Sequence, residues 1–463
     1  MKKRRICVAI ITFGLMAMSA CGDSTGDGQT AAQILADPSF DRSATFYGET
    51  LSMAVLHDFG VAPAIQRYRS LTNRGVDFEV IHFFRGGAPM DIDGARLQLS
   101  AQIMAGEAPV LIDSIFIDQR DPRISALLAD WIPLMNADPD FNEDDVFINV
   151  LNALPVEGRL TEFPRAFTIN AVAANTTIPG LPEALAALPA VTISDLMALR
   201  EEFSTDDAPL YIDRDFNVWF AVRYSIDSFM DFNSRWVDFD SQGFIDFINA
   251  ARAATNPGSP FEMTAFSSID YANAQHELTQ RYLFQIYAAP VSTKQMFTYE
   301  LGAGALFLGA TPLANLNGEI ITFIMEGFLL NASATPMEQA LAYDFVQYLI
   351  TPRGVEGGRF FANHIHREAF RNHTLRDDDG MIANLERLAG LRVAEPIEES
   401  LENAYIIMSE LGNMPMTTLR FANEAIENFI KDTLRDFHYG LISADQAAQM
   451  IQNRVWLVFA EMD

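Results

Sequence analysis

Strands and helices alternate at short spacing between residues 51 and 112, and this alternation constrains the fold more than any other feature of the sequence. Residues 51–56 form a mostly apolar run and residues 76–84 combine β-branched with aromatic side chains, which predicts two strands, and residues 110–112 predict a short buried third. Between the last two strands, apolar residues recur at helical spacing, at Ala95, Leu99 and Ile103. The order predicts an α/β unit built on a largely parallel sheet.

The remainder of the chain shows the same mixture of helical and strand patterns. Helices are expected to begin near Ser194 and near Asp240, and strands are expected at residues 306–309 and 320–324. Thr335-Pro-Met-Glu338 and Ser443-Ala-Asp-Gln446 have the spacing of capping boxes, and each precedes an amphipathic helical pattern. No internal repeat is present.

The first twenty residues have the layout of a secretory signal. Four cations at positions 2–5 precede an apolar stretch that ends at Ala20, and this stretch is shorter than the roughly 20 residues that span a bilayer. Small residues followed by Cys21 resemble the lipobox of bacterial lipoproteins, in which the cysteine sulfur carries a diacylglycerol. We therefore expect residues 1–20 to be a signal peptide and Cys21 to be the lipidated first residue of the mature protein. The alternative is an ordinary signal peptide with an incidental cysteine.

Charge and cysteine content exclude several classes of protein. Residues 1–20 hold four cations and no acids, so the rest of the chain has 28 Lys and Arg against 61 Asp and Glu, a net charge of −33. Such a surface repels nucleic acid and anionic headgroups. No cysteine follows Cys21, which excludes disulfides and thiolate metal sites from the mature part. Residues 21–44 begin with a glycine-rich polar stretch, and we expect them to form a flexible tether in which Ile34 and Leu35 dock on the body.

Four places in the sequence resemble the extracellular solute-binding proteins of family 1, the substrate receptors of bacterial carbohydrate ABC importers. Residues 96–109 resemble that family's R-L-(x)n-I-x-A-G-x-A-P-D segment, although Val110 replaces the aspartate. Residues 157–164 resemble its crossing strand. Residues 307–345 resemble its F-x-G-x-P, S-A-x-S and A-W-x-F run, with Tyr343 in place of tryptophan, and residues 447–455 resemble a terminal A-A-x-I-I-Q-N-R-V helix.

The resemblance implies a two-lobe, periplasmic-binding-protein-like α/β fold of type II with a hinge of crossing segments. Lobe 1 would comprise residues 45–163 and 305–360, and lobe 2 would comprise residues 164–304 and 361–463. A ligand would bind in the cleft between the lobes, which would close by bending at the hinge.

A sugar needs flat rings for its C–H faces and carboxylates or amides for its hydroxyls. Loops at the carboxyl ends of parallel strands are the expected place for such groups. Seven residues follow predicted strands or lie in the second lobe with suitable side chains. They are Asp58, Phe59, Asp113, Ser114, Phe167, Trp219 and Tyr287. For each, the alternative is a cap or a packed core residue, and we assign Trp131 and Trp456 to packing.

Two further patterns suggest metal binding but lack essential ligands. His364 and His366 lie two residues apart, without a positioned carboxylate or cysteine. Residues 138–144 have the alternating oxygens of a calcium loop, but glycine is missing from the sixth position and Asn149 stands where a bidentate glutamate belongs. The triple Asp377–Asp379 is expected to be a solvated turn. We expect no metal and no cofactor.

No nucleophile elbow, phosphate-binding loop or zinc-protease motif is present, so we expect the chain not to be an enzyme. The leading hypothesis is a monomeric receptor on the outer face of the cell membrane, anchored through Cys21, that delivers a carbohydrate to ABC permease subunits. Three alternatives remain: the same fold binding a peptide or a cationic solute, a surface protein for sensing or adhesion, and a glycan hydrolase.

Overall fold

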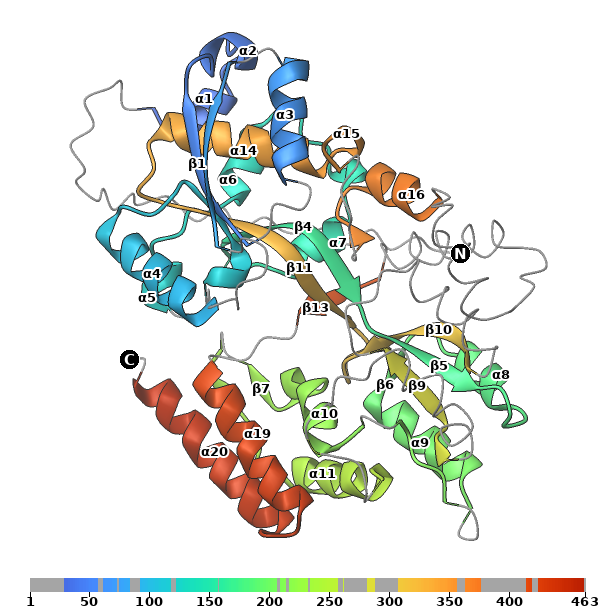
Figure 1. Cartoon of the computed structure of the whole chain (residues 1–463). Helices are drawn as coiled ribbons and strands as arrows, with labels where there is room; N and C mark the ends of the chain where they lie inside the picture. The colour runs from blue at the N-terminus through green and yellow to red at the C-terminus, as the bar shows by residue number, and fades with distance from the viewer. Residues whose placement is uncertain are drawn as a thin grey trace, which may run out of the picture.

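The computed structural model describes residues 29–56, 61–72, 75–83, 92–117, 122–156, 158–205, 209–213, 216–231, 234–256, 261, 281–287, 307–355, 363–375, 414–418 and 424–461. Within these ranges the chain forms two lobes with separate apolar cores (Figure 1). We call the lobe that contains the amino-terminal strands lobe 1, and the lobe that contains the last two helices lobe 2.

The sheet of lobe 1 begins with three parallel strands in the order β2-β1-β3 and continues into the antiparallel strand β11. Their bounds are β1 (Thr50–Val55), β2 (Asp77–His82), β3 (Leu111–Asp113) and β11 (Ile320–Leu330). Helices α3 (Val61–Thr72) and α4 (Ile92–Ala105) connect the parallel strands. The predicted α/β unit is thus confirmed, including the buried face of α4 at Ala95, Leu99 and Ile103.

Successive side chains of each strand point to opposite faces of the sheet, and both faces are covered by packed apolar residues. On β1, Met53 and Val55 join the large core of lobe 1, whereas Ala54 joins a smaller cluster with α4. The other helices and turns of lobe 1 lie around these two clusters. They are α1 (Ala31–Leu35), α2 (Arg42–Thr45), η1 (Ser114–Phe116), α5 (Pro122–Ser125), α6 (Ile132–Ala137), η2 (Glu143–Asp145), α7 (Ile148–Asn152), α14 (Pro336–Ile350), α15 (Pro352–Val355) and α16 (Arg367–Leu375).

Two pairs of strands connect the lobes (Figure 1). β4 (Glu162–Ile169) lies antiparallel to β11 in lobe 1, and the chain continues through Asn170 into β5 (Ala171–Asn175) of lobe 2. β10 (Phe307–Ala314) pairs with β5 in lobe 2 and turns into β11. We call β4, β5, β10 and β11 the crossing strands. Two short strands pair beside them, β12 (Asn363–His364) with β4 and β13 (Met416–Thr418) with β11.

Lobe 2 packs helices around the far ends of the crossing strands. Its core includes Phe244, Phe247, Ile248 and Ala251, from the helix that was expected to begin near Asp240. Its elements are α8 (Leu181–Ala186), β6 (Val191–Thr192), α9 (Ile193–Phe203), α10 (Val218–Arg223), η3 (Ile226–Ser228), β7 (Met230–Asp231), β8 (Trp236–Val237), α11 (Gln242–Ala254), β9 (Phe284–Tyr287), α19 (Glu424–His438) and α20 (Ala444–Glu461).

The packing of two segments differs from the predicted boundaries. Residues 29–44 form α1 and α2 in place of the predicted flexible tether, and Ala31 is buried in the core of lobe 1. The expected docking of Leu35 on the body is confirmed. β12 and α16 pack with lobe 1, since Ile365 and Phe370 belong to its core, whereas the prediction placed everything after residue 360 in lobe 2.

Both predicted capping boxes are confirmed at the starts of α14 and α20. On α20, Ala447, Ile451 and Val455 are buried, whereas Met450 is 43% exposed. The assignment of Trp131 to packing is confirmed by its full burial, whereas the same assignment for Trp456 is wrong because that side chain is 63% exposed. No helix among the described residues is long and apolar enough to cross a membrane.

Candidate functional site

Asp113 lies where two parallel strands end. β1 and β2 run toward lobe 2, so their carboxyl ends face it (Figure 1). Asp113 ends β3 and accepts hydrogen bonds from the backbone N–H of Leu56 at 3.3 Å and of Ile115 at 3.2 Å, one on each carboxylate oxygen. The Asp113 carboxylate therefore ties the end of β3 to the end of β1 and caps η1.

Burial raises the pKa of Asp113 from 3.8 to about 6. The two backbone hydrogen bonds lower the pKa, the Glu326 carboxylate raises it, and the Arg165 guanidinium lowers it. Each carboxylate oxygen has a further lone pair beyond the one that the backbone uses. Asp113 is half-buried, so it can accept another hydrogen bond from a molecule at the sheet edge.

Arg165 and Glu326 form an ion pair on two of the crossing strands. Arg165 on β4 is 3% exposed, and its Nη2 lies 2.6 Å from Oε2 of Glu326 on β11, whose side chain is 42% exposed. β11 also pairs with β3, with Phe328 opposite Asp113. The three charged residues therefore lie together where β11 passes the end of β3.

The structure places the predicted ligand residues in different surroundings. Asp58, Phe59 and Cys21, the predicted lipidation residue, lie outside the described residues. Ser114 is half-buried at the start of η1, next to Asp113. Trp219 on α10 is partly buried against the core of lobe 2. Tyr287 ends β9 opposite Ala171, and its side chain lies outside the described part.

Phe167 is a core residue, in contrast to its predicted place at a cleft. Its side chain is fully buried and packs edge to face against Phe147, with the ring centroids 5.4 Å apart. β4 is covered on both sides, so its side chains are buried from Phe163 to Ile169 whichever way they point. A ring on such a strand has no free face on which a sugar could stack.

Arg165 and Glu326 were not among the predicted site residues. Arg165 stands in the strand segment Glu-Phe-Pro-Arg-Ala-Phe-Thr-Ile, and a lone arginine within an apolar strand signals a buried ion pair. Glu326 pairs with Ala166 between two register shifts of the β11–β4 ladder. Such an irregularity leaves no trace in residue spacing.

The raised pKa of Asp113 predicts a specific dependence of stability on pH. Because the folded pKa of about 6 exceeds the unfolded value of 3.8, the native state binds more protons at Asp113 than the unfolded state between these values. The contribution of Asp113 to stability therefore rises as the pH falls from 7 to 4. The contribution is at most about 3 kcal/mol, since the carboxyl keeps some exposure. Denaturant unfolding of the wild type and of Asp113→Asn at pH 7 and 4.5 measures it. Equal pH slopes for the two proteins would contradict the assignment.

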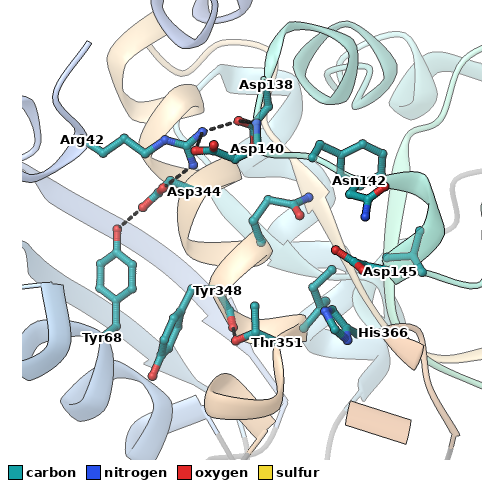
Figure 2. Close-up of a pocket in the computed structure, with 14 residues that line it drawn as sticks. Arg42, Tyr68, Asp138, Asp140, Asn142, Asp145, Asp344, Tyr348, Thr351 and His366 are labelled. Atoms are coloured by element: carbon teal, nitrogen blue, oxygen red, sulfur yellow. Dashed lines mark hydrogen bonds and ion pairs between the residues drawn. The ribbon is translucent and has the colours of Figure 1, made fainter. Parts of the chain in front are cut away.

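A separate pocket of about 270 Å³ lies in lobe 1 (Figure 2). Fourteen residues line it, among them four aspartates, one arginine and one histidine. Arg42 forms ion pairs there with Asp138, Asp344 and Asp140, and the Tyr68 hydroxyl donates to Asp344 at 2.6 Å. Burial lowers the pKa of His366, against the opposite effects of Asp145 and Glu368. Arg42 is therefore the main cation facing these carboxylates at neutral pH.

The patterns that suggested metal binding have other contacts in the structure. Asp138 of the predicted calcium-like loop faces Arg42, and Asn142 caps η2. His364 is buried beside β4, and His366 lines the lobe 1 pocket. Among the residues that the structure describes, no group of three His, Cys, Asp or Glu side chains could hold a metal ion.

Comparison with known proteins identifies the fold through structure alone. No protein-family model matches this sequence, and no curated protein matches it. An extracellular solute-binding protein of family 1 from Alicyclobacillus acidocaldarius aligns with 12% identity and a TM-score of 0.58, over 89% of this chain and 98% of that one. The sugar-binding protein MalE from Xanthomonas citri aligns with 14% identity and a TM-score of 0.58, over 89% and 98% of the two chains.

A third similar structure is an ABC substrate-binding protein from Listeria monocytogenes in complex with cycloalternan. It has 10% identity and a TM-score of 0.52, over 89% of this chain and 98% of that one. The chain therefore has the two-lobe, periplasmic-binding-protein-like α/β fold that the sequence resemblance implied. At these identities the comparisons establish the fold, and the function must be argued from the residues of the site.

Proposed function

We propose that this protein is an extracytoplasmic solute-binding protein that captures a sugar or an oligosaccharide between its lobes and delivers it to an ABC permease. The observation that carries the proposal is the arrangement of two separately packed lobes joined by the crossing strands, with charged residues where lobe 1 meets those strands. Separate cores allow each lobe to move as a unit, and the crossing strands provide a place to bend.

The chemistry at the strand ends suits a neutral polyol. The Asp113 carboxylate and the exposed part of Glu326 can accept hydrogen bonds from hydroxyl groups, and Arg165 fixes the position of Glu326. Trp219 on α10 is a candidate ring for the C–H face of a sugar. We retain Asp58, Phe59, Asp113, Ser114, Trp219 and Tyr287 as proposed ligand contacts and leave out Phe167.

The protein would be exported, anchored at the membrane and in contact with a permease. Residues 1–20 would direct export, Cys21 would carry the lipid anchor at the outer face of the membrane, and the protein would act as a monomer with permease subunits. A binding role without catalysis agrees with the similar structures, which are those of solute-binding and sugar-binding proteins. The net charge of −33 after residue 20 disfavours an anionic ligand.

A thermal-shift screen tests the substrate class. The chain from residue 21 is melted with glucose, maltose, maltotriose, cellobiose and xylobiose, and in parallel with spermidine and short neutral peptides. A ligand at 100 times its Kd adds about 2.7 kcal/mol to stability. We expect at least one saccharide to raise the melting temperature. A shift with spermidine or peptides alone would replace saccharide by that class, and no shift with any compound would contradict capture of a small solute from this set.

A further inference from the structure

Residues 29–46, which we call the strap, are docked on lobe 1 although their position beside the predicted anchor suggested a flexible linker. Thr30 and Gln33 form a reciprocal capping box that starts α1. Ala31, Leu35 and Phe46 are buried in the lobe 1 core, where α1 packs against α6 and α14. The strap is therefore an integral layer of this lobe.

One charged side chain of the strap reaches into the lobe 1 pocket (Figure 2). Arg42 Nη1 lies 3.0 Å from Oδ1 of Asp344, and Nη2 contacts Asp138 and lies 3.3 Å from Oδ2 of Asp140. The side chains of Asp138 and Asp344 are 2% and 5% exposed, whereas that of Asp140 is 78% exposed. The guanidinium thus joins two buried carboxylates at once.

One of these carboxylates follows the end of a helix and the other lies within a second helix, and a third helix supports them. Asp138 follows α6, Asp344 lies within α14, and Tyr68 on α3 donates its hydroxyl to Asp344 Oδ2 at 2.6 Å. Asp138 Oδ1 also accepts from the backbone N–H of Asp140 at 3.0 Å. Burying two negative charges side by side is unfavourable unless a cation with matching donors lies between them. Here the strap supplies that cation.

We propose that Asp138, Asp344 and Tyr68 form a guanidinium seat, that Arg42 fills it from within the same chain, and that this contact locks the strap onto lobe 1. The pocket extends past Arg42 along Gln347, Thr351 and His366, so a small soluble cation can reach the seat when the arginine side chain is shortened. The lock itself does not depend on sugar binding. The proposed lipid anchor at Cys21 precedes the strap in the sequence. The lock would therefore make lobe 1 the lobe held near the membrane, a consequence that rests on the proposed function.

Chemical rescue tests the seat. In the chain from residue 21, which keeps every described residue, Arg42→Ala should lower the melting temperature by roughly 5 °C or more. Millimolar ethylguanidinium should restore most of this loss, and ethylammonium at the same concentration should restore much less, since it lacks the planar fork of donors. Asp140→Asn is the matched control and should melt like the wild type. An Arg42→Ala protein as stable as the wild type, or one rescued equally by both cations, would overturn the seat.

A second variant keeps the test valid if Arg42→Ala does not fold. Combining Arg42→Gln with Asp138→Asn and Asp344→Asn removes the buried charges together with the cation, and this triple variant should fold where the single Arg42 variant does not. If the triple variant also fails to fold, the charge-neutralising role of Arg42 is wrong.

Spin labels test the lock. With Cys21 replaced by serine, labels at Ser39 on the strap and Ala101 on α4 should give one narrow distance distribution without any saccharide. Arg42→Gln should broaden it. A broad distribution with Arg42 present would overturn the lock. Because no sugar is used, a failed saccharide screen would leave this result unaffected.

Discussion

Replacing Trp131 with alanine is expected to lower the free energy of unfolding by about 3–5 kcal/mol. Trp131 is fully buried in lobe 1, with its ring centroid 5.5 Å from that of Phe163 and 6.5 Å from that of Tyr343. Phe163 belongs to β4 and Tyr343 to α14, so the indole packs a crossing strand against the helix that covers it. Denaturant unfolding followed by circular dichroism measures the loss.

Trp456→Ala is the matched control, because it removes the same side chain from a site that is 63% exposed. Its unfolding free energy should lie within about 0.5 kcal/mol of the wild-type value. Comparable losses for the two variants would contradict the core described for lobe 1.

Asp113→Ala is expected to weaken saccharide binding by about 10–100-fold, the range for a lost hydrogen bond to a charged group. The prediction concerns whichever saccharide gives the largest shift in the thermal screen, and titration calorimetry at pH 7.5 measures it. Because a hydroxyl donates to the ionised carboxyl, wild-type affinity should also fall as the pH drops through about 6, the pKa of Asp113.

Two variants separate this role from a structural one. Asp246→Ala removes an exposed carboxylate from α11 and should leave the dissociation constant unchanged. Asp113→Asn keeps an oxygen acceptor and should lose less affinity than Asp113→Ala. If a folded Asp113→Ala protein bound the saccharide as tightly as the wild type, Asp113 would not be a ligand contact.

Periodicity predicted the regular elements well, since burying one face of a helix imposes a spacing that is visible in the sequence. The same reasoning did not distinguish Trp131 from Trp456. Both lie in apolar surroundings in the sequence, and only the packing of α20 on α19 leaves Trp456 outside. The helices of the strap were not predicted because the glycine-rich stretch at residues 22–28, just before it, suggested a tether, although the docking of Leu35 was expected. The capping-box spacing from Thr30 to Gln33 was the local signal for α1.

The candidate site was predictable only in part. The topology of parallel strands placed Asp113 and Ser114 correctly at a carboxyl edge. Phe167 was misplaced because a strand buried on both faces hides every side chain, and alternation alone does not indicate that second cover. Arg165 with Glu326, and Arg42 with Asp344, join residues far apart in the sequence, and such pairs become visible only in the fold.

Solution scattering with and without ligand tests the two-lobe clamp most directly. The radius of gyration of the wild type should decrease when the saccharide identified in the screen is added to saturation, because the lobes close over it. Asp113→Ala at the same saccharide concentration should show a smaller change. An unchanged radius of gyration in a wild-type sample shown by calorimetry to be saturated would contradict closure of the lobes around a captured solute.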